Sequence, residues 1–367
     1  MQKYRVIISG GGTGGHIFPA IAIANALKAL SPNIEILFIG AEGRMEMEKV
    51  PAAGYNIKGL WISGLQRSLT LKNLSFPFKL ISSLFKAKKI LKQFKPDVAV
   101  GVGGYASGPM LHVAAKSGIP ALLQEQNSYP GITNKLLANK VQKICVAYDG
   151  MERFFPKEKI MLTGNPVRKD IRNLDGKKAR GVEYFKIDPD KKTLLIIGGS
   201  LGARTINLAI EASLNIYAEN DIQVIWQTGK AYFEKAKTAC VKYADKGIYA
   251  HEFISKMDYA YAVADFVVSR SGAISVSELC LVKRPVILIP SPNVAEDHQT
   301  KNAMALVVHN AALLVKDFEA VDKLANEVLN LSNNIELQEK LMQNIAQLGK
   351  ADAAEVIANE VISLIEK

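Results

Sequence analysis

The residue in this sequence best suited to chemistry is a histidine that directly follows a run of glycines. Residues 9–16 read Ser-Gly-Gly-Gly-Thr-Gly-Gly-His, after an apolar, strand-like segment and before a helical pattern. Glycine lets the backbone approach a ligand closely, and the unpaired N–H groups of a helix N-terminus favour an anion. We therefore expect a phosphate-binding loop with His16 beside it as a general base. A capping or packing role for His16 is the alternative.

Two further glycine loops follow strand-like segments, one at residues 103–109 and one at residues 198–204. The loop at residues 9–16 also has the dinucleotide-binding spacing G-x-G-x-x-G, at Gly10, Gly12 and Gly15, and Glu42 is placed to hold a ribose. A nicotinamide-dependent oxidoreductase needs only one such loop. Three loops divided between two units favour a cleft with anion-binding helix ends on both sides, for two phosphorylated substrates.

The elements that must position these loops alternate along the whole chain. Apolar, β-branched segments lie at residues 4–8, 34–39, 98–102, 121–123 and 144–147, and again at 194–197, 224–227, 266–269, 286–289 and 313–315. A further strand-like segment at residues 160–162 closes the first unit. Alternation with helical patterns predicts an α/β fold with parallel sheets covered on both faces. The glycine pattern of residues 11–15 recurs 187 residues later, so we expect two similar α/β domains, at residues 1–165 and 166–345.

The composition supports two cores. The chain has 367 residues, 49% hydrophobic and 22% charged, which is ample apolar material for two domains. Its apolar segments are too short to span a membrane, and no secretory signal precedes the first strand, so we expect a cytoplasmic protein. Three cysteines without a C-x-x-C spacing indicate reduced thiols.

The excess positive charge lies in the first half of the chain. Residues 1–165 contain 21 lysines and arginines against nine acidic residues, and residues 49–96 contain no acid. Such a surface suits a polyanion, either nucleic acid or anionic lipid headgroups. The lack of a recognisable nucleic-acid-binding motif weakens the nucleic-acid interpretation.

Within residues 69–96 we expect a basic amphipathic helix that Ser75 caps and that Pro77 pre-organises in its first turn. Helical spacing gathers its apolar side chains in one sector: Leu74, Phe78, Ile81, Leu84, Phe85 and Leu91. Its lysines lie opposite or at its end: Lys72, Lys79, Lys86, Lys88, Lys89 and Lys92. We expect the tips of Phe76, Phe78 or Phe85 to enter an anionic membrane beside these lysines. Packing of the sector on the sheet is the alternative.

Eight motifs then occur in a specific order: GGTGGHIFPA, GGYASGP, LQEQN, GNPVR, GGSLGAR, HEFI, RSGAISVSE and DHQTKNA. Over nearly the whole chain they resemble the MurG family, the N-acetylglucosaminyltransferases of peptidoglycan synthesis. The resemblance implies a GT-B fold of two Rossmann-like domains, with an N-terminal acceptor domain and a C-terminal UDP-N-acetylglucosamine (UDP-GlcNAc) domain facing a deep cleft. It implies inverting transfer of GlcNAc to the C4 hydroxyl of MurNAc-pentapeptide-pyrophosphoryl-undecaprenol (lipid I), giving lipid II. It also implies that a helix at residues 351–365 packs back on the N-terminal domain.

The resemblance implies roles for single residues. His16 is the expected base, and Glu125 is the alternative. The acceptor diphosphate is expected at Gly103, Gly104, Tyr105, Ser107 and Gly108. UDP-GlcNAc is expected to contact Thr13, Gly14, Gly15, Asn127, Arg168, Ser200, Ile254, Ala273, Ile274, Ser275, Val276, Ser277, Glu278 and Gln299.

In this set, Ser200 serves the diphosphate, Glu278 the ribose and Ile254 the uracil, while Asn127 and Gln299 read the sugar. The alternatives are a solvated helix residue for Glu278, a hinge ion pair for Arg168, and polar surface residues for Asn127 and Gln299. For the membrane surface we expect contacts from Lys72, Phe78, Lys79, Phe85, Lys86 and Lys89.

The resemblance implies no required cofactor or metal ion and leaves stimulation by a divalent metal open. Its expected partners are UDP-GlcNAc, lipid I, an anionic membrane surface and other cell-wall synthesis proteins, and no nucleic acid. It implies a peripheral enzyme on the cytoplasmic side of the bacterial membrane, with a role in cell shape and division. A UDP-GlcNAc 2-epimerase and a transferase with another lipid-linked acceptor remain alternatives within the fold. A basic nucleic-acid-binding module is the alternative from another class.

Overall fold

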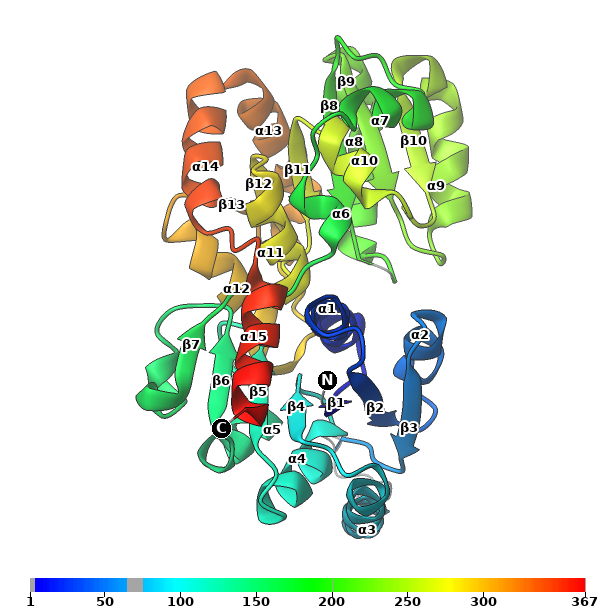
Figure 1. Cartoon of the computed structure of the whole chain (residues 1–367). Coiled ribbons are helices and arrows are strands. Elements are labelled where there is room, and N and C mark those ends of the chain that lie inside the picture. The colour runs from blue at the N-terminus through cyan, green and yellow to red at the C-terminus, as the bar shows by residue number, and fades with distance from the viewer. Residues whose placement is uncertain (1–3, 65–74, 200, 367) are drawn as a thin grey trace. The chain divides into compact units, whose positions relative to one another are not determined.

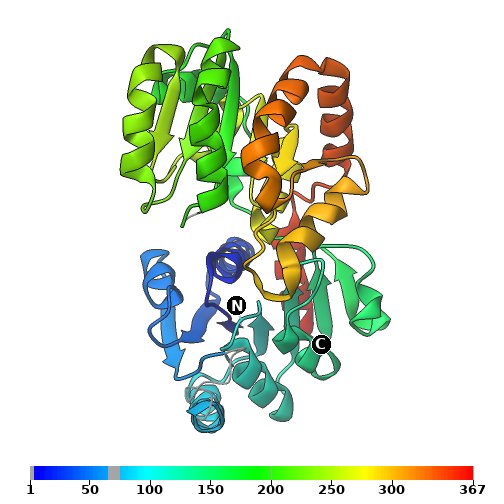
Figure 2. The same cartoon turned by 180° about the vertical axis from the view of Figure 1, so that it is seen from behind.

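The chain folds into two units, each built on a parallel sheet. The computed structural model describes residues 4–64, 75–199 and 201–366. One unit comprises Met1–Val167 together with Lys350–Lys367, and the other comprises Arg168–Gly349 (Figures 1 and 2). The division expected at residue 165 lies two residues before this boundary.

The sheet of the first unit has the strand order β3-β2-β1-β4-β5-β6-β7 over the described residues. The strands are β1 Arg5–Ser9, β2 Glu35–Ala41, β3 Asn56–Leu60, β4 Val98–Gly101, β5 Ala121–Glu125, β6 Lys143–Val146 and β7 Ile160–Leu162. The order reverses between β1 and β4, which pair in parallel. The glycine loops that follow these two strands therefore leave the same edge of the sheet, at the switch point where α/β folds bind ligands.

Helices cover both faces of this sheet. They are α1 Gly14–Leu30, α2 Glu46–Ala52, α3 Phe76–Phe94, α4 Ser107–Lys116, α5 Ile132–Leu137 and α15 Ala353–Ile365. Because neighbouring strand residues point to opposite faces, Val6 and Ile8 pack in one core with α1 and α15, and Ile7 packs in the other with α3 and α4. The last helix of the chain thus lies beside α1 in the first unit (Figure 1).

The second unit repeats the architecture with the strand order β10-β9-β8-β11-β12-β13. The strands are β8 Lys192–Ile197, β9 Ile222–Gln227, β10 Ile248–His251, β11 Phe266–Ser269, β12 Val286–Leu288 and β13 Leu313–Leu314. The helices are α6 Lys169–Arg172, α7 Lys178–Phe185, α8 Arg204–Glu219, α9 Phe233–Cys240, α10 Met257–Val263, α11 Ala273–Val282, α12 His298–Val307, α13 Ala320–Asn333 and α14 Ile335–Gln347. Its switch point lies between β8 and β11, whose following loops lead into α8 and α11.

Two edge strands are absent from the sequence prediction. β3 and β10 each form an edge of a sheet, and the β3 sequence Asn-Ile-Lys-Gly-Leu is exposed or half-buried over its first three residues. An edge strand needs no continuous apolar run because one side of it faces solvent, so its pattern is weak. The apolar runs predict every strand that lies inside the two described sheets, and they also predict the edge strands β7 and β13.

Buried cysteines and short apolar segments complete the description. Cys145, Cys240 and Cys280 are buried and free of disulfides. Over the described residues, no helix combines the length and apolar character needed to cross a bilayer. The same residues contain no cluster of three or more histidines, cysteines and acids that could hold a metal ion.

Candidate functional site

His16 lies in the first turn of α1, where it contacts both glycine loops of the first unit. Its Nδ1 lies 3.3 Å from the hydroxyl oxygen of Thr13. A Cβ added to Gly103 would lie 2.9 Å from Nε2 and Cδ2 of the ring, so that loop must have glycine there. If Nδ1–H donates to Thr13, Nε2 carries the lone pair. Nε2 is then the atom that can take a proton from a substrate hydroxyl.

The two glycine loops are fastened to each other. Gly103 and Gly104 have positive φ angles of 87° and 83°, and a Cβ on Gly104 would overlap the carbonyl oxygen of Gly11. The buried Ser107 hydroxyl lies 2.6 Å from the carbonyl oxygen of Ser9 and 2.9 Å from that of Gly103. The hydroxyl proton lies between these two carbonyl oxygens and joins the loops. Contact of Ser107 with a diphosphate stays a prediction.

The other expected acceptor-loop residues lie around the start of α4. Tyr105 is 45% exposed, and its ring packs against Gly64. Gly108 lies in the first turn of α4, whose first turn contains no acidic residue. The backbone N–H groups at this helix start suit an anion, together with the positive end of the helix dipole.

Glu125, at the end of β5, is a buried carboxylate that organises its own loop. It accepts hydrogen bonds from the backbone N–H of Asn127 at 3.0 Å, from the Asn127 amide at 3.2 Å and from the N–H of Gly131 at 3.2 Å. The Asn134 amide donates to it at 2.8 Å. Burial raises the pKa of Glu125, and these hydrogen bonds oppose the rise. Glu125 is 2% exposed, so this geometry favours His16 as the base.

Asn134 is a residue of this site that the sequence analysis misses. Its amide nitrogen lies 3.7 Å from the position of a Cβ on Gly103, the glycine that packs against His16. Its side-chain oxygen is buried and has no hydrogen-bond partner among the residues that the structure describes. The available signal was weak, namely one amide within the short helix α5. The structure thus brings Thr13, His16, Gly103 and Asn134 together, with Glu125 behind them.

In the second unit, the glycine loop after β8 leads directly into α8. Gly199 and Gly202 have positive φ angles of 84° and 78°, and a Cβ on Gly202 would overlap the carbonyl oxygen of Thr228. The first turn of α8 contains no acidic residue, so its N–H groups and dipole suit a diphosphate. Ser200, expected to contact that diphosphate, lies outside the described residues.

Gln227, at the end of β9, links this loop to the segment expected to contact uracil. Its amide donates to the carbonyl oxygen of Gly199 at 3.1 Å, and its side-chain oxygen accepts from the N–H of Ile254 at 3.0 Å. Ile254 is 3% exposed. Its N–H group is therefore engaged within the protein, and Gln227 is a second residue that the motifs do not reveal.

Glu278, on α11, is paired with Arg168. The guanidinium donates from Nε to Oε1 at 3.1 Å and from the terminal nitrogen to Oε2 at 3.3 Å, and the Tyr261 hydroxyl donates to Oε2 at 3.4 Å. Burial raises the pKa of Glu278, and the charge of Arg168 opposes the rise. The solvated-helix alternative for Glu278 is therefore wrong, since this side chain is 6% exposed. A ribose diol would meet a carboxylate that Arg168 already orients.

The rest of the α11 segment divides by burial. Gly272 precedes the helix, and Ala273 and Val276 point into the core, with Val276 at 1% exposure. Ile274, Ser275 and Ser277 are half-buried and able to reach a ligand. In the neighbouring helix α12, the side-chain oxygen of Gln299 accepts from the N–H of Ser291 at 2.8 Å. This bond fixes the amide that was expected to read the sugar.

The expected membrane helix is present as α3, but its faces differ from the expected ones. Leu91 packs in the core, and Leu84 and Phe76 pack partly buried against it, whereas Phe78 is 70% and Phe85 72% exposed. The prediction of a single apolar sector is therefore wrong, because some of its side chains pack toward the sheet and others face solvent. Ser75 precedes the helix without a side-chain capping bond.

The lysines of α3 are not all unopposed. Lys86 pairs with Glu42 at 2.6 Å, and Lys79 donates to the Ser63 hydroxyl at 3.0 Å beside the Trp61 ring. Glu42 lies outside the acid-free segment in sequence, but the fold places it beside a lysine of that segment. Lys89 is exposed, and Lys72 lies outside the described residues.

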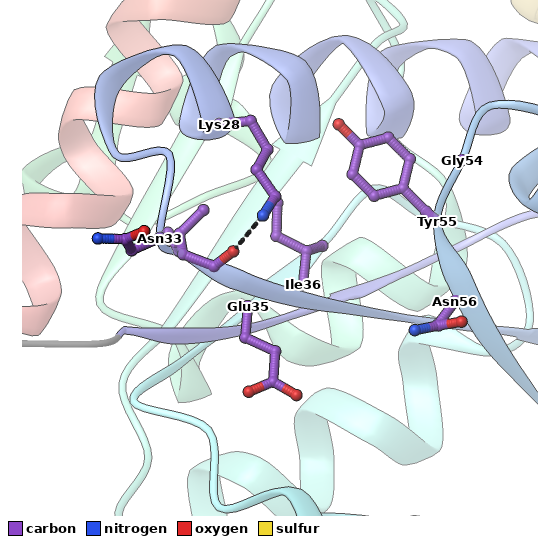
Figure 3. Close-up of a pocket in the computed structure, with 8 residues that line it drawn as sticks. Lys28, Asn33, Glu35, Ile36, Gly54, Tyr55 and Asn56 are labelled. Carbon is purple, nitrogen blue, oxygen red and sulfur yellow. Dashed lines mark hydrogen bonds between the residues drawn. The ribbon is translucent and has the colours of Figure 1, made fainter.

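A separate pocket opens at the amino ends of β2 and β3, on the edge of the sheet opposite the glycine loops (Figure 3). Lys28, Asn33, Tyr55 and Asn56 contribute to its lining. The Lys28 ammonium donates to the carbonyl oxygens of Ile34 at 2.6 Å and Pro32 at 3.3 Å, and Tyr55 donates to Asn25. These groups hold the turn after α1, so the pocket has no part in the site.

Comparison with known proteins identifies both units. The family model described as the Glycosyltransferase family 28 N-terminal domain matches residues 6–146, and that of the C-terminal domain matches residues 193–357. A protein of Cytophaga hutchinsonii is 58% identical over 99% of this chain and 98% of its own length, and one of Parabacteroides distasonis is 54% identical over all of both. Both are named UDP-N-acetylglucosamine–N-acetylmuramyl-(pentapeptide) pyrophosphoryl-undecaprenol N-acetylglucosamine transferase.

Solved structures agree on the architecture. The crystal structure of MurG from Acinetobacter baumannii has a TM-score of 0.80 and 26% identity, covering 98% of this chain and 99% of its own. A UDP-GlcNAc 2-epimerase from Neisseria meningitidis, bound to UDP-GlcNAc, has a TM-score of 0.69 at 16% identity and covers 99% of this chain and 100% of its own. The second likeness concerns the fold alone. With the two parallel sheets, the first supports the GT-B class expected from the motifs.

Proposed function

This chain belongs to glycosyltransferase family 28, and we propose that it transfers N-acetylglucosamine from UDP-GlcNAc to MurNAc-pentapeptide-pyrophosphoryl-undecaprenol. Relatives that are 52–58% identical over nearly their whole length carry this activity in their names. We further propose that the acceptor group is the C4 hydroxyl, that the product is lipid II, and that the anomeric configuration inverts.

The observation that carries the proposal is the placement of His16 between two glycine loops. Nε2 takes the proton of the acceptor hydroxyl while that oxygen forms a bond to C1 of GlcNAc. The bond between C1 and the UDP oxygen breaks at the same time, and its electron pair leaves with UDP. Attack from the face opposite the leaving group inverts C1, and no covalent enzyme intermediate is needed.

The second unit stabilises the departing UDP in this proposal. Backbone N–H groups at the start of α8 receive the diphosphate, and Glu278 accepts hydrogen bonds from the ribose hydroxyls. Arg168, which pairs with Glu278, adds a positive charge near the nucleotide. Since protein groups can neutralise the leaving group, we propose that the reaction requires no metal ion or other cofactor.

A single assay tests this function. Purified protein is given UDP-GlcNAc with and without a lipid I analogue, each with and without EDTA, and UDP release and the disaccharide product are measured. We expect UDP and the disaccharide only when the acceptor is present, with or without EDTA. A 2-epimerase would instead act without acceptor and yield the C2 epimer of the sugar. Loss of activity in EDTA would contradict the metal-independent mechanism alone.

We also propose that α3 brings the enzyme to the membrane surface. An undecaprenyl chain holds the acceptor in the bilayer, because each buried CH₂ contributes about 0.8 kcal/mol. Phe78, Ile81 and Phe85 are 53–72% exposed, and Trp61, which is 49% exposed, lies against Lys79 beside this helix. Tryptophan and lysine are typical of membrane–water interfaces. We place the protein on the cytoplasmic face as a peripheral enzyme.

A further inference from the structure

A carboxylate that has no part in this mechanism is buried against the first glycine loop. Glu46, the first residue of α2, is 1% exposed. Its Oε1 accepts from the backbone N–H of Ala41 at 2.9 Å, and its Oε2 accepts from that of Gly12 at 2.9 Å. One side chain therefore ties the end of β2 to the loop that follows β1.

The neighbouring glycines leave room for this carboxylate. A Cβ on Gly11 would overlap the carboxylate of Glu46, and one on Gly40 would lie 2.5 Å from its Cγ. Two positions thus lack side chains where Glu46 enters. The N–H of Gly12, which a phosphate-binding loop would offer to an anion, is donated to Glu46 instead.

Contacts lead from this carboxylate to the base. Gly11, which packs on Glu46, presents its carbonyl oxygen to Gly104 so closely that a Cβ there would overlap it. Gly103, the preceding residue, packs against the His16 ring. The series of contacts from Glu46 to His16 thus passes through both glycine loops, and no flexible side chain lies between them.

We propose that Glu46 is a positioning residue for His16. It holds Gly12 and Ala41 in place, and the loop so fixed sets the position of the imidazole relative to the acceptor. The proposal rests on the proposed transferase function, in which His16 is the base. The position of the imidazole affects the rate strongly, because a displacement of about 1 Å at a reacting group can lower a rate about a hundredfold.

The test compares Glu46→Gln with the matched control Glu48→Gln. Glutamine has nearly the same shape, but it has one acceptor oxygen, so its NH₂ group must face one of the two backbone N–H donors. Glu48 lies on the same helix, is 78% exposed and pairs with Lys49. Calorimetry measures UDP affinity, urea unfolding verifies that the first unit, which contains Glu46, is folded in each variant, and kcat and KM are measured for a lipid I analogue. Amide hydrogen exchange reports on residues 9–17 and 38–42.

For Glu46→Gln we expect about tenfold to hundredfold lower kcat/KM for the acceptor, unchanged UDP affinity, and faster exchange at Gly12 or Ala41. Glu48→Gln should match the wild type. A normal rate despite faster exchange would overturn the link to His16, and unchanged exchange would overturn the tie itself. A lower rate that partial unfolding of the first unit accounts for would reveal a folding defect and also overturn the proposal. A wild type that transfers no GlcNAc would contradict the proposed function, whereas the exchange result would still test the tie.

Discussion

The two candidate bases of the first unit, His16 and Glu125, differ in what surrounds them. Glu125 is buried, and its carboxylate accepts hydrogen bonds from Asn127, Gly131 and Asn134. His16 is half-buried, with Nδ1 beside Thr13 and Nε2 beside Gly103. A base must reach its proton before its pKa matters. On this ground we propose the imidazole as the base, while Glu125 supports the loop that carries Asn127.

His16→Ala should lower kcat by about 10²–10⁴-fold, the range for a lost general base, and leave UDP affinity unchanged. Steady-state kinetics with a lipid I analogue and UDP calorimetry measure both. His112→Ala is the matched control, because His112 lies on α4 and interacts with Lys140. Near-normal turnover in His16→Ala would return His16 to a packing role.

A pH dependence follows from Glu278. Burial raises the pKa of this carboxyl, so it takes up a proton at a pH above the ordinary range of glutamate. As pH falls through that raised pKa, the ionised acceptor for the ribose hydroxyls is lost and UDP should bind more weakly. Glu278→Gln should bind UDP about tenfold more weakly at neutral pH, because a hydrogen bond to a charged group contributes about 1.5–3 kcal/mol.

Calorimetry measures the UDP affinities of the wild type and of Glu278→Gln from pH 4 to 8. The ratio of the two affinities cancels the titration of UDP itself. The two affinities should converge on acidification. A constant ratio of affinities across the range would contradict the ribose assignment of Glu278.

Single-residue roles could be predicted where a motif names the residue, and not where a distant segment supplies its partner. The motifs contain His16, Glu125 and Glu278. They do not show that Arg168 pairs with Glu278 across 110 residues, or that Gln227 occupies the N–H of Ile254. Such pairs depend on the order of strands in the sheet, which a motif does not contain.

At the scale of the element, α3 shows how helical periodicity misleads when both faces are apolar. Leu84 and Leu91 point to the sheet, whereas Phe78 and Phe85 point to solvent, although a helical wheel places them in one sector. Hydrophobicity alone does not distinguish a core face from a membrane face. The position of the helix beside β3 and α4 decides between them.

Membrane binding by α3 should depend on its C-terminal lysines. Charge reversal of Lys88, Lys89 and Lys92 should weaken binding to phosphatidylglycerol or cardiolipin vesicles at least tenfold, since each lysine contributes about 1 kcal/mol at an anionic surface. Vesicle flotation at low and high salt measures this binding, and high salt should weaken the binding of the wild type.

The matched control reverses Lys237, Lys242 and Lys246, exposed lysines of the second unit. It should bind vesicles like the wild type. Equal loss in both triple variants would mean that net charge, and not the surface of α3, attracts the protein to lipid.

At the scale of the whole molecule, the second unit is continuous in sequence and the first is not. Residues 350–367 return to complete the first unit, where Ile357 and Val361 of α15 are fully buried in the core that contains Val6 and Ile8. Two glycine-loop sheets were predictable from the repeated pattern. The partner of the last helix was not predictable from its apolar stripe, which fits any uncovered sheet face.

Ile357→Ala should destabilise the first unit by about 2–5 kcal/mol, the usual cost of such a cavity. Urea unfolding measures the loss, and UDP affinity should remain unchanged because the residues expected to contact the diphosphate, the ribose and the uracil lie in the second unit. Ile335→Ala is the control, since Ile335 on α14 is 69% exposed and its truncation should change stability by less than about 0.5 kcal/mol. Equal effects of the two substitutions would contradict the packing of α15.

The return of α15 sets an order of events during synthesis on the ribosome. The face of β1 that carries Val6 and Ile8 is made first, but part of its cover, α15, is made last. At about 5–20 residues per second, the roughly 200 residues between Val167 and Ile365 take about 10–40 s to translate. Throughout that interval the nascent first unit presents an incompletely covered apolar face, which is a binding surface for chaperones. The second unit, whose residues are contiguous, can complete its fold before the first one does.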